Sequence, residues 1–196
     1  MGVTLGLTST LRAVIGAIDD TARLLEEAQL TVGEGLCTLA SRSARTVLAR
    51  DLTDPTETRW PGFVHQLHQL PVRAVIAVPL TVAPNAIGSL DIHSLRPSGL
   101  DDLEPARLDA VADTMNQAVL RTQLIDHVRD EHHTNRVGIS QAAGMVMAPL
   151  HVSSDTALAR LRGAAFLEDR WLTDIAGDIV TGRRPADPPT VPTNAA

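Results

Sequence analysis

A long stretch without helix breakers divides this sequence into two parts. After Pro105, neither Gly nor Pro occurs until Gly138. Apolar residues recur within it at three- and four-residue steps, as on one face of an α-helix: Leu108, Val111, Ala112, Met115 and Val119. The segment from Asp101 to Pro105 offers an Asp cap and a Pro suited to the first turn. We expect a helix of roughly 30 residues, which is longer than a small core covers and favours a coiled-coil or bundle partner.

The part before this helix alternates between two hydrophobic patterns. Short β-branched runs bounded by turn residues predict strands, and three- to four-residue spacing predicts helices. Asn85 falls between the two strongest strands, where we expect a hairpin turn. The predicted strands are 3–8, 13–18, 46–52, 72–80 and 87–93, and the predicted helices are 21–30, with Leu24, Leu25 and Ala28 on one face, 37–44 and 60–70.

The part after the long helix is predicted to be helical throughout. One helix spans 137–150 and ends near Pro149; another spans 153–169 with Ser153 as its cap; a third spans 172–181 and stops at Gly182. The last residues, 183–196, contain four prolines, and we expect a disordered tail there.

Composition excludes several classes of protein. The chain has 196 residues, of which 44% are hydrophobic, so it can bury a core. Its formal charge of −6 disfavours a protein that coats nucleic acid or an anionic membrane. Cys37 is the single cysteine, so no internal disulfide forms. Neither a signal peptide nor an apolar run of about 20 residues is seen, so we expect a cytoplasmic protein without a membrane partner.

Few residues suggest catalysis or metal binding. Cys37 follows a Gly turn near a helix start, where the helix dipole stabilises a thiolate, although a buried structural role is favoured. His65 and His68 lack a third ligand and are interpreted as a surface pair. Asp91 and His93 share a strand face that could line a pocket, but no nucleophile or paired carboxylate completes a catalytic set. We therefore predict no enzyme, no metal and no cofactor.

The charge is unevenly distributed along the chain. Residues 132–173 hold four arginines against three acidic residues, whereas residues 1–125 hold ten against fourteen. Arginines can contact phosphates, and Arg170 beside Trp171 offers a cation next to a stacking surface. The alternatives are a solvated helix face for Arg160 and Arg162 and core packing for Trp171. A single unit with so few cations would bind RNA weakly, and a dimer would double the contacts.

Four sequence segments resemble a GAF domain, a fold that senses small molecules. They are VGEGLC at 32–37, RWPGF at 59–63, VRAVIAVPL at 72–80 and IGSLDIHSLRP at 87–97. The order and spacing are similar to those of actinobacterial GAF regulators. Leu36 stands where the family usually has Pro before the cysteine.

The stretch from about Asn135 to Val180 resembles an ANTAR domain, a three-helix RNA-binding module of antitermination regulators. The residues that carry this resemblance are VGISQAAGMVMAPLHVSSDTALARLRGAA, followed by WLTDIAGDIV. Ala143, Ala164 and Asp169 stand where the family usually has a basic residue, an aromatic residue and an Asn. These departures remove a cation, a ring and an amide from an RNA surface.

The resemblance implies a fold and a set of contacts. We expect an α+β protein with a GAF-like antiparallel sheet and flanking helices (1–120), a linking helix with an ANTAR-like three-helix bundle (121–182), and the tail (183–196). In the helix around Gln141, small residues permit close approach of another helix, which is favoured, or of a nucleic acid. The expected RNA contacts are Arg136, Gln141, Ala142, Gly144, Arg160, Arg162, Arg170 and Trp171.

The resemblance also implies a function. We expect a homodimeric transcription antitermination regulator that binds RNA stem-loops in nascent transcripts and carries an unidentified small ligand in its GAF domain. The alternative is a ligand-sensing or scaffold protein whose ANTAR part no longer binds RNA. A third reading is a GAF enzyme acting on free methionine sulfoxide; it is disfavoured because such enzymes use a resolving cysteine, which this chain lacks.

Overall fold

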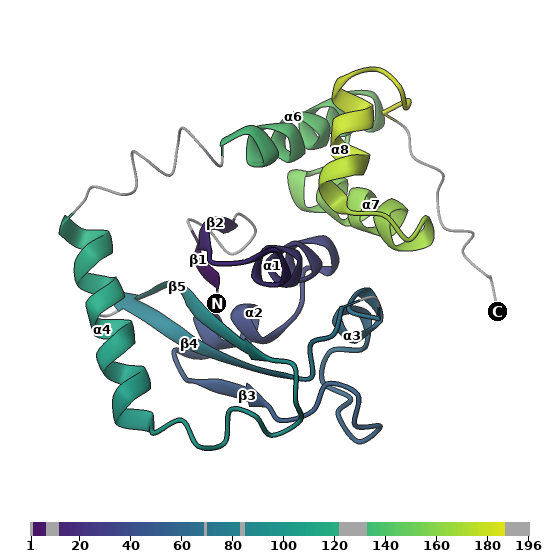
Figure 1. The fold of residues 1–196 in the computed structure, drawn as a ribbon. Coiled ribbons are helices and arrows are strands. Elements are labelled where there is room, and N and C mark those ends of the chain that lie inside the picture. The colour runs from purple at the N-terminus through teal and green to yellow at the C-terminus, as the bar shows by residue number, and fades with distance from the viewer. Residues whose placement is uncertain (1, 7–11, 69, 83–84, 122–132, 187–196) are drawn as a thin grey trace. The chain divides into compact units, whose positions relative to one another are not determined.

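The chain forms two compact units, residues 1–132 and 133–196 (Figure 1). The structure is a computed structural model that describes residues 2–6, 12–68, 70–82, 85–121 and 133–186. Within its described residues, the N-terminal unit combines a sheet with four helices: α1 (Asp20–Val32), α2 (Leu36–Ser43), α3 (Pro61–Gln66) and α4 (Pro105–Arg121). The C-terminal unit contains the helices α6 (His133–Leu150), α7 (Ser154–Leu167) and α8 (Leu172–Val180).

The sheet has five antiparallel strands in the order β2-β1-β5-β4-β3. The strand bounds are Gly2–Gly6 (β1), Arg12–Ala17 (β2), Val47–Ala49 (β3), Ala74–Val82 (β4) and Asn85–Ser94 (β5). The longest ladder joins β4 to β5 and pairs Ala77 with Asp91 and Val78 with Leu90. The strand runs predicted from β-branched residues are thus confirmed, as is the mixed α+β class.

Helices cover both faces of the sheet. Leu90 of β5 packs in one core cluster with Leu108 and Ala112 of α4. Because side chains alternate along a strand, Asp91 points to the opposite face, where Gln29 of α1 contacts it. Figure 1 shows β4 and β5 with α4 on one side and α1 and α2 on the other.

The N-terminal unit differs from the sequence prediction at several boundaries. Asn85 was expected in a turn but is the first residue of β5, paired with Val82, because the ladder continues beyond a register shift between Leu80 and Thr81. Helix α3 ends at Gln66, four residues earlier than expected. On α1 the buried face holds Leu25, Glu26, Ala28 and Gln29, while Leu24 is only partly buried.

The expected long helix is described in part. Helix α4 begins at Pro105, the proline that the sequence predicts for the first turn, rather than at Asp101. The Asp101 carboxylate, upstream of the helix, accepts hydrogen bonds from Arg50 Nε at 3.0 and 3.2 Å. The helix is described up to Arg121. Residues 122–132, on which a continuous helix depends, lie outside the described part, so its length stays a prediction.

The three C-terminal helices enclose a core of their own. Its largest fully buried side chains are Val146, Leu161, Leu172, Ile175 and Ile179. Ser153 caps α7, as expected, by accepting a hydrogen bond from the Thr156 N–H at 3.2 Å. The sequence predicts disorder from Arg183 onward, yet Arg183 and Arg184 form ion pairs with Asp178 and Glu168. Residues 187–196 of the expected tail lie outside the described part.

Candidate functional site

Polar side chains line the face of β5 that lies opposite α4. Ser89, Asp91 and His93 alternate with Leu90, which faces α4, and therefore share the other face. Ser89 and Asp91 are fully buried. Buried polar groups are costly without partners, so this face is where the N-terminal unit departs from an apolar core.

Helix α1 contributes two further buried polar groups to this region. Gln29 Nε2 donates to Asp91 Oδ2 at 2.7 Å, and Gln29 Oε1 accepts from the Cys37 N–H at 2.8 Å. One amide thus joins α1 to β5 and to the start of α2. Glu26, three residues earlier and therefore on the same side of the helix, is 2% exposed.

The turn between α1 and α2 sets the position of Cys37. Gly35 has φ 136° and ψ −176°, a backbone conformation that is essentially restricted to glycine. A Cβ at this position would lie 2.5 Å from Gln29 Oε1. Glycine therefore allows the chain to pass directly over the Gln29 amide and places Cys37 in the first turn of α2.

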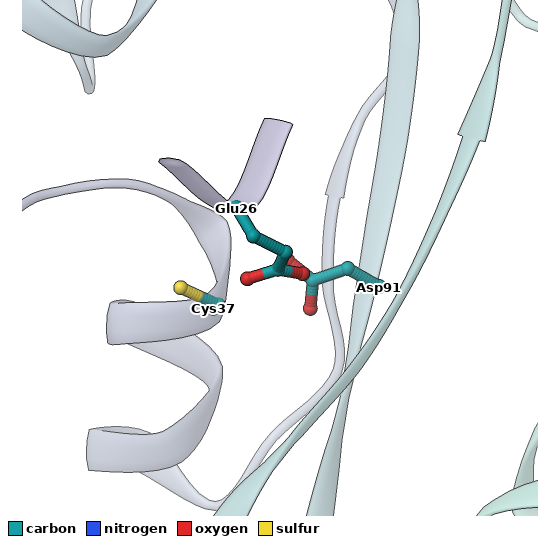
Figure 2. Close-up of side chains that lie close together, drawn as sticks. All are labelled: Glu26, Cys37 and Asp91. Atoms are coloured by element: carbon teal, nitrogen blue, oxygen red, sulfur yellow. The ribbon is translucent and has the colours of Figure 1, made fainter. Parts of the chain in front are cut away.

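Glu26, Cys37 and Asp91 converge into one buried cluster. Each offers one ligand atom, the thiol sulfur or a carboxylate oxygen, and these atoms lie within 4.8 Å of one another. Figure 2 shows the carboxylates of Glu26 and Asp91 pointing toward each other, with Cys37 beside them on α2. Among the described residues this is the group of three that has the arrangement of a metal site. A cation fits such a donor set.

His93 lies next to this cluster in sequence but has a separate environment. Its Nε2 is 3.9 Å from Asp19 Oδ1. Burial lowers the pKa of His93 below its ordinary value of 6.5, and Asp19 opposes this with a smaller increase. The ring is therefore neutral at pH 7. His65 and His68 are exposed, and their rings stack with centroids 5.6 Å apart.

A second polar region is a surface hollow beside β3, and its charges already pair within the unit. Arg50 binds Asp101, Arg59 binds Glu57, and Arg73 Nη2 lies 2.7 Å from Asp51 Oδ2. The hydrogen bond from Arg73 holds the pKa of Asp51 well below its ordinary value. We therefore assign this hollow no ligand. Its lining residues are Leu48, Arg50, Asp51, Asp54, Thr56, Glu57 and Arg59.

The predicted RNA residues of α6 differ in exposure. Gln141 and Gly144 are exposed and lie three residues apart on the same side of the helix. Ala142 is fully buried in the core of the unit, so it has no surface to offer RNA. Arg136 lies in α6, but its side chain is outside the described part.

The predicted RNA residues near α7 and α8 do not form one patch. Arg160 and Arg162 are partly exposed and lie two residues apart, so they point to opposite sides of α7. Arg170 Nη2 lies 2.7 Å from Asp178 Oδ2, which neutralises its charge. The partly buried Trp171 is the N-cap residue of α8.

The substitutions in the ANTAR-like motif have a structural place. Ala143 and Ala164 are buried, whereas Asp169 is exposed at a positive φ of 50°. Two of the three family departures therefore change the core of the C-terminal unit rather than its surface.

The comparison with protein families identifies the N-terminal unit. Residues 4–119 match the GAF domain, which is more than half of the chain, and the chain belongs to the GAF family. GAF domains commonly bind small ligands. The ANTAR resemblance stays a prediction.

Comparisons with curated proteins and with solved structures do not narrow the function further. No curated protein matches the chain. One solved structure, a type II free methionine-R-sulfoxide reductase from Thermoplasma acidophilum, is similar with a TM-score of 0.36 and 26% identity. The match covers 46% of this chain and 59% of that one.

None of the described helices is both long and apolar enough to cross a bilayer.

Proposed function

We propose that the chain is a dimeric regulator of transcription antitermination, in which the GAF domain senses a small molecule and the C-terminal unit binds RNA. The observation that carries the proposal is a compact three-helix unit with its own core that follows a GAF domain in the same chain. Its sequence resembles ANTAR domains, and Gln141, Arg160 and Arg162 reach its surface. The proposal contains no catalytic step.

The proposed mechanism is a competition between RNA structures. Binding that stabilises one hairpin withholds a strand from the terminator, so transcription continues. Sequence-specific proteins read unpaired loop bases by stacking and hydrogen bonding, and Gln141 is suited to this contact. A ligand in the GAF domain changes RNA binding only if it has different affinities for two states of the dimer.

A gel shift with an RNA that carries two hairpins with hexanucleotide loops tests this function. We expect the full chain to bind this RNA, with weaker binding as salt rises because phosphate contacts release counterions. Arg162→Ala should weaken binding several-fold. Arg42→Ala is a matched control, since Arg42 is exposed on α2 in the other unit. Absence of any shift at low salt, or an equal effect of both variants, would contradict the proposal.

A second candidate function is ligand sensing without RNA binding. It is favoured by the ion pair of Arg170 with Asp178 and by the outer face of α6, whose exposed residues around Gln141 and Gly144 carry no charge. The same gel shift separates the candidates. RNA capture from cells, followed by sequencing, would name the target if RNA binding is found.

A further inference from the structure

The buried cluster of Glu26, Cys37 and Asp91 brings together three elements that are distant in sequence. Glu26 lies on α1, Cys37 in the first turn of α2 and Asp91 on β5. Their exposed fractions are 2%, 1% and 0%. The spacing of residues along one helix cannot produce this cluster. The three side chains meet only when α1 and α2 have packed against β5 in the folded unit.

The electrostatics of the cluster favour a positive charge at its centre. Two ionised carboxylates repel one another, and the repulsion is strong in a buried site because the effective dielectric constant is low. A shared proton or a bound cation relieves this repulsion. The Cys37 thiol lies within 4.8 Å of both carboxylates and adds a third donor atom. Two carboxylates are enough to share a proton, whereas a metal site of this kind needs a third protein ligand.

A neighbouring hydroxyl gives independent evidence for a ligand in this region. Ser89 is fully buried, and among the described residues its Oγ has no hydrogen-bond partner. It lies two residues before Asp91 on β5, on the same face of the strand and opposite Leu90. A buried hydroxyl without a partner is energetically costly. This cost is removed if the oxygen meets a bound ion's water or an added ligand.

The donor set selects the kind of ion. Thiolate is a soft ligand that Ca²⁺ and Mg²⁺ do not use, whereas Zn²⁺ and similar divalent transition-metal ions accept thiolate and carboxylate together. Around a tetrahedral Zn²⁺, with bonds of about 2.0–2.3 Å, donor atoms lie roughly 3.5 Å apart. The present spacing of up to 4.8 Å therefore has to shorten when an ion binds. Gln29 Nε2 donates to Asp91 Oδ2, and this hydrogen bond orients the carboxylate.

We propose that Glu26, Cys37 and Asp91 bind one divalent transition-metal ion of the Zn²⁺ type, with a fourth position open to water or a small ligand. This deepens the sensing half of the proposed function, because it names a ligand class for the GAF domain. It does not depend on RNA binding. A negative gel shift therefore bears on the RNA proposal alone, and a negative metal titration bears on this one alone.

Titration of the full chain with Co²⁺ after treatment with a chelator tests the site. We expect one equivalent of Co²⁺ to produce a thiolate-to-metal charge-transfer absorption, which Zn²⁺ then abolishes by displacement. Cys37→Ser should remove this absorption. Glu26→Gln and Asp91→Asn keep the shape of each side chain and should weaken Co²⁺ binding at least 10-fold, the scale of losses seen around metal sites. Asp20→Asn, an exposed carboxylate at the start of α1, is the matched control and should bind as wild type.

Folding and competing sites are controlled in the same experiment. Circular dichroism establishes that each variant is folded, and Zn²⁺ should raise the thermal unfolding temperature of the wild type but not of Asp91→Asn. The exposed pair His65 and His68 is the competing site. Absence of the charge-transfer absorption, or Co²⁺ binding that survives Asp91→Asn and disappears in His65→Ala, overturns the proposal.

Discussion

The carboxylate of Asp178 forms ion pairs with two guanidinium groups, so the stability of the C-terminal unit depends on pH in the acid range. Arg170 Nη2 lies 2.7 Å from Oδ2 and Arg183 Nε lies 2.8 Å from Oδ1. The hydrogen bond from Arg170, followed by that from Arg183, lowers the pKa of Asp178 below its ordinary value of 3.8. Because the folded-state pKa is the lower one, these bonds stabilise the fold fully above about pH 4, and their contribution is lost as the pH falls through the folded-state pKa.

We therefore expect Asp178→Asn to lower the thermal unfolding temperature at pH 7, and the difference from wild type to shrink as the pH falls below about 4. Far-ultraviolet circular dichroism at a series of pH values measures this. Asp169→Asn is the control, because Asp169 is exposed and forms no ion pair within the part of the chain described. A difference that stays constant however far the pH is lowered would show that the carboxylate charge does not stabilise the fold.

Two glycines with opposite surroundings give a paired prediction. At Gly35 an added Cβ would meet Gln29 Oε1 at 2.5 Å in a backbone conformation that other residues avoid. Gly35→Ala should destabilise the chain by about 1–3 kcal/mol. At Gly144, within α6, the Cβ would meet nothing within 4 Å. Gly144→Ala should stabilise it by about 0.5–1 kcal/mol, since Ala favours a helix. Urea unfolding measures both, and effects of the same sign would contradict this account.

At the scale of single elements, the start of α7 depends on one side chain. Ser153 Oγ accepts from the Thr156 N–H at 3.2 Å, which satisfies one of the unpaired donors at the helix start. Ser153→Ala should cost about 1 kcal/mol of stability in urea unfolding. Ser154→Ala, at the first helical residue, is the control and should change stability by less than half as much. Equal losses would mean that the cap is not the source of the effect.

Elements whose cause is local were predictable from the sequence. The alternating runs that become β4 and β5 and the Ser153 cap of α7 depend on residues close together in the chain. The start of α4 at Pro105 has the same kind of local cause, because proline suits the first turn of a helix. The ion pair of Asp101 with Arg50, 51 residues earlier, was not predictable, because a local pattern predicts an element but not its distant partners.

The candidate metal cluster was found in part. The alternation of Asp91 and His93 predicted a polar strand face, and Cys37 was expected to be buried. Glu26 and Gln29 were missed, because Gln29 meets Asp91 across 62 residues. The sequence held only a weak signal for them. Glu26 and Gln29 are polar residues that lie at helical spacing with Ala22 and Leu25, on the apolar face of α1.

At the scale of the whole molecule, the proposed function requires more charge than one C-terminal unit supplies. Arg170 is paired with Asp178, and the other predicted phosphate contacts are Arg136, Arg160 and Arg162. Three phosphate contacts give a slope of log K against log salt of about −2 on single-stranded RNA. Binding of this kind is weak, so two copies that engage one RNA together gain affinity through their high effective concentration.

The salt dependence therefore measures how many units bind. If two protomers act together on a two-hairpin RNA, the slope should be about −4, and Arg162→Ala should reduce it by about 1.4, one contact in each copy. Fluorescence anisotropy over a range of salt concentrations gives the slope, and sedimentation of the protein alone gives its mass. An RNA with one hairpin is the control, and its slope should fall to about −2. A monomer whose slope is the same on both RNAs would rule out paired binding, because each unit would then act independently.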